Sequence, residues 1–251
     1  MAIDIKVIPT LHGDEAMRFI NNADEVMKSK ERVDFSEKIA IARAILKKSW
    51  NVIMGFLLDK CKLKKMDDEI LSACHPFTCG DEDLDDFFLH DAMRYKAELL
   101  GKTYCFVLDD DPKTIVCMFT LSNDSIRVDV IPNSRGRKLS HDIPREKRMR
   151  RYPAVLIGRL GINVDFRHQG IGSELLDFIK SWFVDEDNKT GCRFLIVDAY
   201  NCMVPLNFYQ KNEFFFLFST EQQEAENLGY DMTKSLHTRL MYYDLKKLTS
   251  N

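Results

Sequence analysis

The chain has 251 residues, of which 45% are hydrophobic, and its formal net charge is only −3. This length allows one domain of ordinary size and a small appendage. The sequence holds no run of about eighteen apolar residues, and its first residues lack the basic and apolar regions of a signal peptide. These features exclude a membrane-spanning class and predict a cytoplasmic protein, in which seven cysteines, an odd number, are typical of reduced thiols.

Residues 1–52 form the first predicted unit. Ile3, Ile5 and Val7 alternate with polar residues, which predicts a short strand. Apolar residues then recur at helical spacing in two runs, and the second run opens with a capping-box-like pattern at Asp34. We therefore expect a strand followed by two helices.

The next predicted unit is a helical connector over 53–76, and the main domain is expected to occupy 77–251. Its first half contains a helix that runs towards Leu100 and strands over 103–108 and 115–128.

The most informative stretch joins a predicted strand to a predicted helix. The run from Ala154 to Ile162 is short and rich in aliphatic and β-branched residues, which predicts a buried strand. From Ile171 to Trp182, apolar residues recur at three- and four-residue steps, which predicts a helix packed on a sheet. The turn between them reads Arg-His-Gln-Gly-Ile-Gly over 167–172. Such a turn gathers unpaired backbone N–H groups at the positive end of a helix dipole, which favours a pyrophosphate.

A second buried strand over 193–199 follows at the spacing of a strand-helix-strand unit. A short helix with the pair Phe208-Tyr209 comes next, and two further strand-like runs cover 214–218 and 239–245.

These features resemble the GNAT N-acetyltransferases. The turn over 167–172 matches that family's Arg-x-x-Gly-x-Gly signature for acetyl-CoA, and a short helix with a Phe-Tyr pair ends at Gly-Phe in the family. Here Glu213 replaces that glycine, so we expect Asn212 to take the left-handed conformation instead. The family's asparagine seven residues before the tyrosine is also offset, because Cys202 holds that position and Asn201 lies beside it.

Narrower motifs resemble the GNAT toxins of type II toxin-antitoxin modules. They are Phe-x-Cys-Gly at 77–80, Leu-Asp-x-Phe at 84–87, Tyr-x-Phe-Val at 104–107, Phe-Thr-Leu-Ser at 119–122 and Ile-Gly-Arg-Leu-Gly-Ile at 157–162. The resemblance covers about 77–245, and residues 1–52 look like the antitoxin-type proteins found beside such toxins. It implies an α+β GNAT fold: a central mixed, mostly antiparallel twisted sheet flanked by helices, with a small helical module at the N-terminus. A homodimer is the usual arrangement in such toxins.

The resemblance further implies acetyl-CoA as the cofactor. The strand edge and the turn would hold its pantetheine arm and pyrophosphate. The predicted cofactor-binding residues are Leu160, Gly161, Ile162, Arg167, His168, Gln169, Gly170, Ile171, Gly172 and Ser173. Tyr209 is the predicted acid for the departing thiolate, because a phenol's ordinary pKa, near 10, is close to that of a thiol. No general base is evident; Glu174 and Asp198 are interpreted as structural.

Positive charge is concentrated between Pro132 and Arg151, where eight basic residues face two acidic ones. Such a segment on an otherwise acidic chain suits a polyanion. We therefore predict tRNA binding by Arg135, Arg137, Lys138, Lys147, Arg148, Arg150 and Arg151.

The leading hypothesis is a toxin-type enzyme that acetylates the α-amino group of aminoacyl-tRNA and so blocks translation. That amine is less basic than a lysine, so it needs little base catalysis. An antitoxin, or the chain's own N-terminal module, is the expected restraint.

Two alternatives remain open. The enzyme could acetylate a small amine or a protein amino group, with the basic segment serving coenzyme A alone. It could instead be a regulatory protein that senses acetyl-CoA and contacts DNA through residues 1–52, although the outward face of that strand shows Asp4 beside a single Lys6. Cys74, His75 and Cys79 invite a zinc site, but the chain offers no second matching pair, so we predict no metal.

Overall fold

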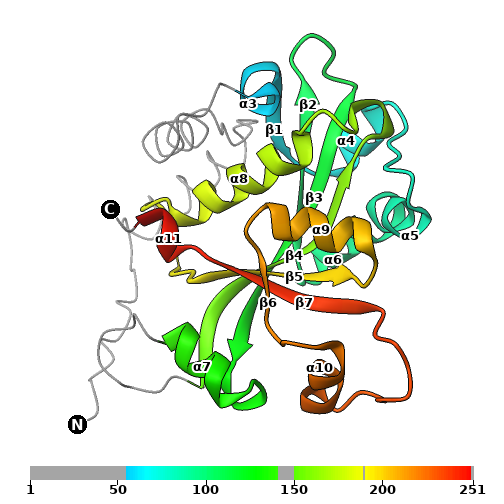
Figure 1. Cartoon of the computed structure of the whole chain (residues 1–251). Helices are drawn as coiled ribbons and strands as arrows, with labels where there is room; N and C mark the ends of the chain where they lie inside the picture. Colours follow the sequence, from blue (N-terminus) through cyan, green and yellow to red (C-terminus); the bar gives the residue numbers. More distant parts are fainter. Residues whose placement is uncertain (1–54, 141–149, 189, 250–251) are drawn as a thin grey trace, which may run out of the picture. The chain divides into compact units, whose positions relative to one another are not determined.

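The computed structural model describes residues 55–140, 150–188 and 190–249, and the predicted module over 1–52 lies outside them. The described part is built on a seven-stranded sheet with the order β1-β2-β3-β4-β5-β7-β6 (Figure 1). Its strands are β1 (Cys61–Lys65), β2 (Lys102–Leu108), β3 (Ile115–Arg127), β4 (Arg151–Ile162), β5 (Phe194–Tyr200), β6 (Phe215–Phe216) and β7 (Thr238–Asp244). Neighbouring strands are antiparallel except β4 and β5, which are parallel. The predicted mixed, mostly antiparallel sheet is confirmed.

Nine α-helices lie in the described part. They are α3 (Phe56–Lys60), α4 (Asp68–Ala73), α5 (Glu82–Asp86), α6 (Ala92–Ala97), α7 (Asn133–Ser140), α8 (Ile171–Val184), α9 (Met203–Lys211), α10 (Glu221–Leu228) and α11 (Lys246–Thr249). A π-helical turn, Phe87–Asp91, joins α5 to α6, so the predicted helix towards Leu100 is a run of three short pieces. In the described part, no helix is long and apolar enough to cross a bilayer.

Helices cover both faces of the second half of the sheet. In Figure 1, α8 and α9 lie above β5 and β7, and α7 and α10 lie below them. On the α7/α10 face, Leu139 of α7 and Leu228 of α10 pack in one cluster with Phe194 and Ile196 of β5. On the α8/α9 face, the predicted apolar stripe of α8 is buried, and its Phe178 meets Phe106 of β2 edge-on. Because alternate residues of a strand face opposite sides, each β5 position is assigned to one of these two faces.

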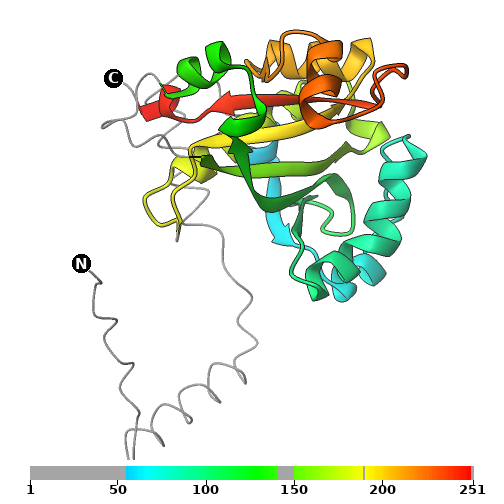
Figure 2. The ribbon, with the colours of Figure 1, turned by 90° about the horizontal axis from the view of Figure 1, so that it is seen from below.

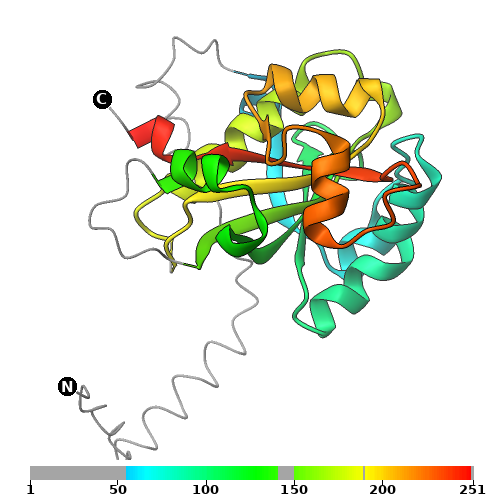
Figure 3. The same ribbon diagram turned by 60° about the horizontal axis from the view of Figure 1, so that its bottom comes forward.

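The helices α4, α5 and α6 gather at one side of the sheet, where they appear in cyan and teal in Figures 2 and 3. Phe87 and Phe88 anchor them on a buried cluster that includes Cys105 of β2 and Met118 of β3. This grouping carries the Phe-x-Cys-Gly motif to the end of β4, as described below.

One predicted element is wrong. Residues 53–76 were expected to be helical, but Cys61–Lys65 forms strand β1, which pairs with β2. Cys61 and Leu63 are buried while Lys62 between them is exposed, which is the alternation of a strand with one covered face. The helical prediction holds for α3 and α4 on either side.

Candidate functional site

The central feature of the site is a gap between β4 and β5. These strands pair over only three positions, and the last pair is Leu156 with Ile196. Beyond it, β4 continues to Ile162 paired with β3, and β5 continues to Tyr200 paired with β7. Among the described strands, nothing pairs with the facing edges past Leu156, so their N–H and C=O groups can bind an extended ligand.

A bulge in β4 lies where the two strands part. Thr120 of β3 is opposite Arg159 and Leu121 is opposite Ile157, which leaves Gly158 as an extra residue. A bulge bends its strand and increases the local twist. The predicted cofactor residues Leu160, Gly161 and Ile162 follow directly after the bulge, on the unpaired edge.

The predicted turn leads from β4 into α8. His168 has φ 61° and Gly170, the residue before the helix, has φ 81°, so the backbone is left-handed at both positions. The backbone N–H groups of Ser173 and Glu174 donate to the carbonyl oxygen of Gly170 at 3.0 and 3.1 Å. The N–H groups of Ile171 and Gly172 precede these first helical bonds and point out of the helix start. This geometry, at the positive end of a 14-residue helix, suits an anion.

The Phe-x-Cys-Gly motif braces this turn from the side. A Cβ on Gly80, which has φ 70°, would lie 3.2 Å from both terminal nitrogens of Arg167, so the guanidinium packs directly on the glycine. The backbone N–H of Val164 donates to the carbonyl oxygen of Thr78 at 3.0 Å. Asp85 accepts bonds from the Thr78 hydroxyl and the Cys79 backbone N–H, which fixes the segment. The sequence motif was visible, but its contact with Arg167 was not.

Two glycines mark close approaches around the gap. A Cβ on Gly161 would lie 3.0 Å from the ring of Phe88 and 3.1 Å from Cβ of Cys79, so β4 runs tightly over the motif. A Cβ on Gly172 would lie 3.0 Å from the ring of Phe208, so the first turn of α8 touches α9. The start of α8 and the helix that carries the predicted acid therefore pack directly on each other.

Tyr209 lies on α9, on the α8/α9 face. Its half-buried ring contacts the rings of Phe208 and Phe214 at centroid distances of 5.1 and 5.4 Å. Among the described residues, none forms a hydrogen bond with its hydroxyl. Burial raises the pKa of Tyr209 above the ordinary phenol value, so the group stays protonated into alkaline solution. It is consequently a weaker acid than the ordinary phenol assumed from sequence.

The end of α9 corrects a second prediction. Asn212 was expected to be left-handed, but it has φ −92°, and Glu213 has φ 63° instead. The Phe214 N–H donates to the Tyr209 carbonyl and the Glu213 N–H to the Gln210 carbonyl, which is the Schellman arrangement. Glu213 thus occupies the glycine position of the motif itself.

Replacing Glu213 with glycine is expected to stabilise the protein. A left-handed conformation costs a side-chain-bearing residue roughly 1–2 kcal/mol, and glycine's extra chain entropy offsets part of this gain. We expect the free energy of unfolding in urea to rise by about 0.5–1 kcal/mol. Asn212→Gly is the matched control and should lower stability; a gain there and none for Glu213→Gly would contradict the assignment.

The other face of the gap carries mainly acidic groups. The Tyr200 hydroxyl donates to Oδ2 of Asp83 on α5 at 2.9 Å. Arg159 stacks over Phe87 at 4.9 Å and donates to the Gly158 carbonyl, while its Nε is buried without a partner in the described part. Asp198 lies two residues before Tyr200 on β5. None of these positions was given a functional role from sequence, because strand pattern alone does not reveal which face opens onto a gap.

The predicted basic residues are only partly described. Arg135 and Arg137 lie on α7, and Arg150 and Arg151 lie at the beginning of β4. Arg137, Arg150 and Arg151 are exposed, and Arg135 is half-buried. The side chain of Lys138, together with all of Lys147 and Arg148, falls outside the described residues. These four arginines therefore lie on α7 and at the beginning of β4, at the opposite end of β4 from Ile162.

The two remaining candidates named from sequence have packing roles. Glu174 accepts the backbone N–H groups of Leu57 and Leu58 and so caps α3. Asn201 donates its side-chain amide to the Leu236 carbonyl and holds the segment before β7. Cys74 and Cys79 are free thiols, and the described residues contain no group of three metal-ligating side chains.

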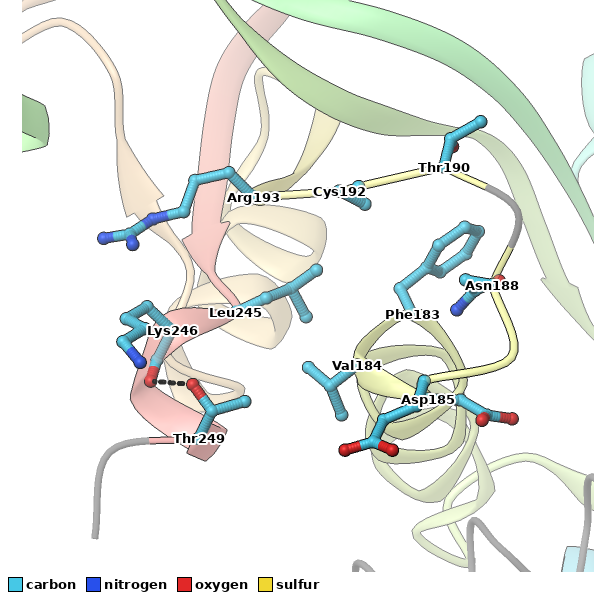
Figure 4. Close-up of a pocket in the computed structure, with 12 residues that line it drawn as sticks. Phe183, Val184, Asp185, Asn188, Thr190, Cys192, Arg193, Leu245, Lys246 and Thr249 are labelled. Carbon is cyan, nitrogen blue, oxygen red and sulfur yellow. Dashed lines mark hydrogen bonds between the residues drawn. The ribbon is translucent and has the colours of Figure 1, made fainter. Parts of the chain in front are cut away.

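A separate cavity of about 380 Å³ opens at the far end of α8 (Figure 4). Val184 and Asp185 at the end of α8 face Leu245 and Lys246 at the beginning of α11 across it. It lies at the other end of α8 from Gly170 and is not part of the gap.

Comparison with known proteins identifies the architecture. No family model matches the chain. Among solved structures, a tyrosine-to-phenylalanine mutant of KacT superposes with a TM-score of 0.57 at 19% identity, over 76% of this chain and 98% of that chain. AtaT in complex with acetyl-methionyl-tRNAfMet gives 0.54 at 17% identity, over 75% and 97%. AtaTR bound with AcCoA gives 0.52 at 19% identity, over 76% and 97%.

The chain has the GNAT fold. The sheet order, the single parallel pair and the helix that begins at Gly170 are the parts of this GNAT fold that form the gap. The fold predicted from the glycine turn and the toxin motifs is confirmed.

Proposed function

We propose that this protein is an acetyl-CoA-dependent N-acetyltransferase of the toxin kind, which acetylates the α-amino group of aminoacyl-tRNA. One observation carries the proposal: β4 and β5 part after Leu156 and Ile196, directly beside the start of α8. A thioester with a pyrophosphate tail needs an extended edge for its arm and an anion site at its end, and the gap supplies both.

In this proposal, the cofactor lies along β4 and ends at the turn. The edge at Leu160, Gly161 and Ile162 pairs with the pantetheine amides. The backbone N–H groups of the turn and the first helical turn bind the pyrophosphate, with Arg167 adding positive charge. Acetyl-CoA bound to AtaTR in a structure of the same fold supports the assignment. When bound, acetyl-CoA supplies the acetyl group.

Tyr209 then donates a proton to the departing thiolate. It lies on the helix that touches the first turn of α8, and its hydroxyl is not committed to another described residue. Since its pKa is raised, the donating form is present throughout the neutral range.

The acceptor is assigned on two grounds. AtaT, which shares the fold, was solved with acetyl-methionyl-tRNAfMet. The arginines on α7 and at the beginning of β4 provide positive charge that phosphates would neutralise. The structures of a mutant AtaT toxin with the C-terminus of the antitoxin AtaR support a peptide antitoxin as a further partner.

The direct test is acetyl transfer from radiolabelled acetyl-CoA to a pool of aminoacylated tRNAs, captured on filters. We expect label in acid-precipitable RNA that is lost when the tRNA is deacylated beforehand. Label that remains after deacylation, or none at all with intact tRNA, would contradict the proposal.

Reversing two charges is expected to separate tRNA binding from cofactor binding. Arg150→Glu with Arg151→Glu should weaken binding of charged tRNA and reduce the slope of log affinity against log salt by about 2, because each lost phosphate contact removes about 1. The KM for acetyl-CoA should stay unchanged. A matched control reverses Lys62 and Lys64 on β1; equal weakening there would contradict a specific contact.

A second candidate is acetylation of a small cationic amine. The carboxylates of Asp83, Asp124 and Asp198 near the gap favour it, because they would attract a polyamine. Spermidine and free lysine in the same assay would reveal this activity as acid-soluble label.

A further inference from the structure

The second face of the gap holds a carboxylate that the proposed function leaves unused. Phe194 and Ile196 of β5 pack into the cluster with α7 and α10. Because strand positions alternate, Asp198 and Tyr200 project from the same face. Tyr209 and the start of α8 belong to the opposite face. Asp198 follows the last β4–β5 pair by two residues, so it lies at the rim of the gap, across from the proposed acid.

The Asp198 carboxylate also has no partner in the described part of the chain. Its side chain is exposed, and the carboxylate forms no hydrogen bond or ion pair with any residue in the described part of the chain. Its neighbours are different: Asp83 accepts the Tyr200 hydroxyl, and Glu224 of α10 holds Arg239 at 2.6 Å and the Leu240 backbone N–H at 2.7 Å. A carboxylate at the rim of a gap that has no partner among the described residues can bind a ligand.

Partial desolvation and neighbouring negative charges make Asp198 a stronger base than an ordinary aspartate. Its pKa is raised first by partial desolvation, then by the negative charges of Asp124 on β3 and Glu224 on α10, while Arg159 on β4 opposes the shift. Asp124 faces the same side, because it is opposite Ala154, a member of the α7/α10 cluster. Glu224 is itself paired with Arg239 of β7.

We infer that Asp198 takes the proton from the acceptor's ammonium group as the amine enters the gap from the α7/α10 face. This inference rests on the proposed function and adds the base that it lacked. Helix α7, which carries Arg135 and Arg137, covers this same face, so an acceptor held there can place its amine at the gap.

The proton balance is complete. The ammonium N–H bond breaks and its proton moves to the Asp198 carboxylate, which leaves a lone pair on nitrogen. That pair forms a bond to the thioester carbon, and the carbon–sulfur bond breaks as Tyr209 protonates the sulfur. The amide nitrogen loses its second proton to water, and water returns a proton to the Tyr209 oxygen, while Asp198 releases its own.

The test is the pH dependence of kcat/KM for the pool of aminoacylated tRNAs, measured between pH 5.5 and about 8.5 at saturating acetyl-CoA. For Asp198→Asn we expect a rate about 100-fold below wild type at pH 6, with recovery as pH rises, because the amine then loses its proton unaided. Calorimetry should show unchanged acetyl-CoA affinity.

A second variant tests the charge coupling. Asp124→Asn removes a negative charge that raises the pKa of Asp198, so the acidic limb of the profile should move to lower pH. Glu226→Gln on α10 is the matched control and should leave the profile unchanged. A wild-type enzyme that acetylates the pool while Asp198→Asn keeps the same profile would overturn the inference alone. A wild-type enzyme with no activity on the pool would overturn the proposed function, and the inference with it.

Discussion

Replacing Gly170 with aspartate is expected to lower acetyl-CoA affinity at least about 100-fold, which is about 2.8 kcal/mol. A Cβ on Gly170 would meet no atom within 4 Å, so the new side chain would project into the open space in front of the first turn of α8. A carboxylate there occupies the proposed position of the pyrophosphate and repels its charge. Isothermal calorimetry with acetyl-CoA measures the effect.

The chain provides a closely matched control for this change. Gly229 after α10 has φ 74°, and a Cβ there would also meet no atom within 4 Å. Gly229→Asp therefore carries the same free-energy cost of a left-handed backbone without changing the turn before α8. Both variants should lose about 1–2 kcal/mol of stability. Equal acetyl-CoA affinity in the two variants would remove the turn from the cofactor site.

Replacing Tyr209 with phenylalanine is expected to reduce turnover about 100- to 10,000-fold while acetyl-CoA affinity stays within about twofold. The ring contacts with Phe208 and Phe214 survive the change, so only the proton donor is lost. In the wild-type enzyme, burial raises the pKa of Tyr209, so loss of this proton should not reduce activity in neutral or mildly alkaline solution. Single-turnover assays measure the chemical step.

Tyr242 supplies the comparison for the phenol. It is a buried tyrosine of β7 on the α7/α10 face, and burial raises its pKa as well. Tyr242→Phe removes a hydroxyl away from the proposed acid and should leave turnover nearly unchanged. A comparable loss in both variants would indicate a general effect of the substitution, and full activity of Tyr209→Phe would exclude the residue from catalysis.

The regular spacing of apolar residues was sufficient to predict the helices and strands that pack against the core with one face. The stripe of α8 and the buried run before Ile162 were predicted because their apolar spacing is long and regular. The beginning of β4 was missed, since Pro153 cannot donate to a ladder, yet it lies opposite Ser125 within the strand. Strand β1 was missed because it is five residues long and three of them are lysines.

Only the parts of the site that depend on a local sequence motif could be predicted. The glycine turn needs specific backbone angles, and these leave a trace in sequence at Gly170. The gap depends on how far two strands pair, which is a property of register and twist that no single segment encodes. Asp198 could be placed only after the last pair was known. The left-handed residue after α9 was misassigned because the motif's position outweighed the preference of asparagine for that conformation.

The two ends of the sheet constrain how a second copy could associate. β1 forms one edge and carries Lys62, Lys64 and Lys65, while the other edge, β6, is two residues long. Positive charge and brevity are both devices that prevent strands of separate molecules from joining into a continuous sheet. Self-association through these two described edges is therefore disfavoured, and a homodimer would have to form through other surfaces.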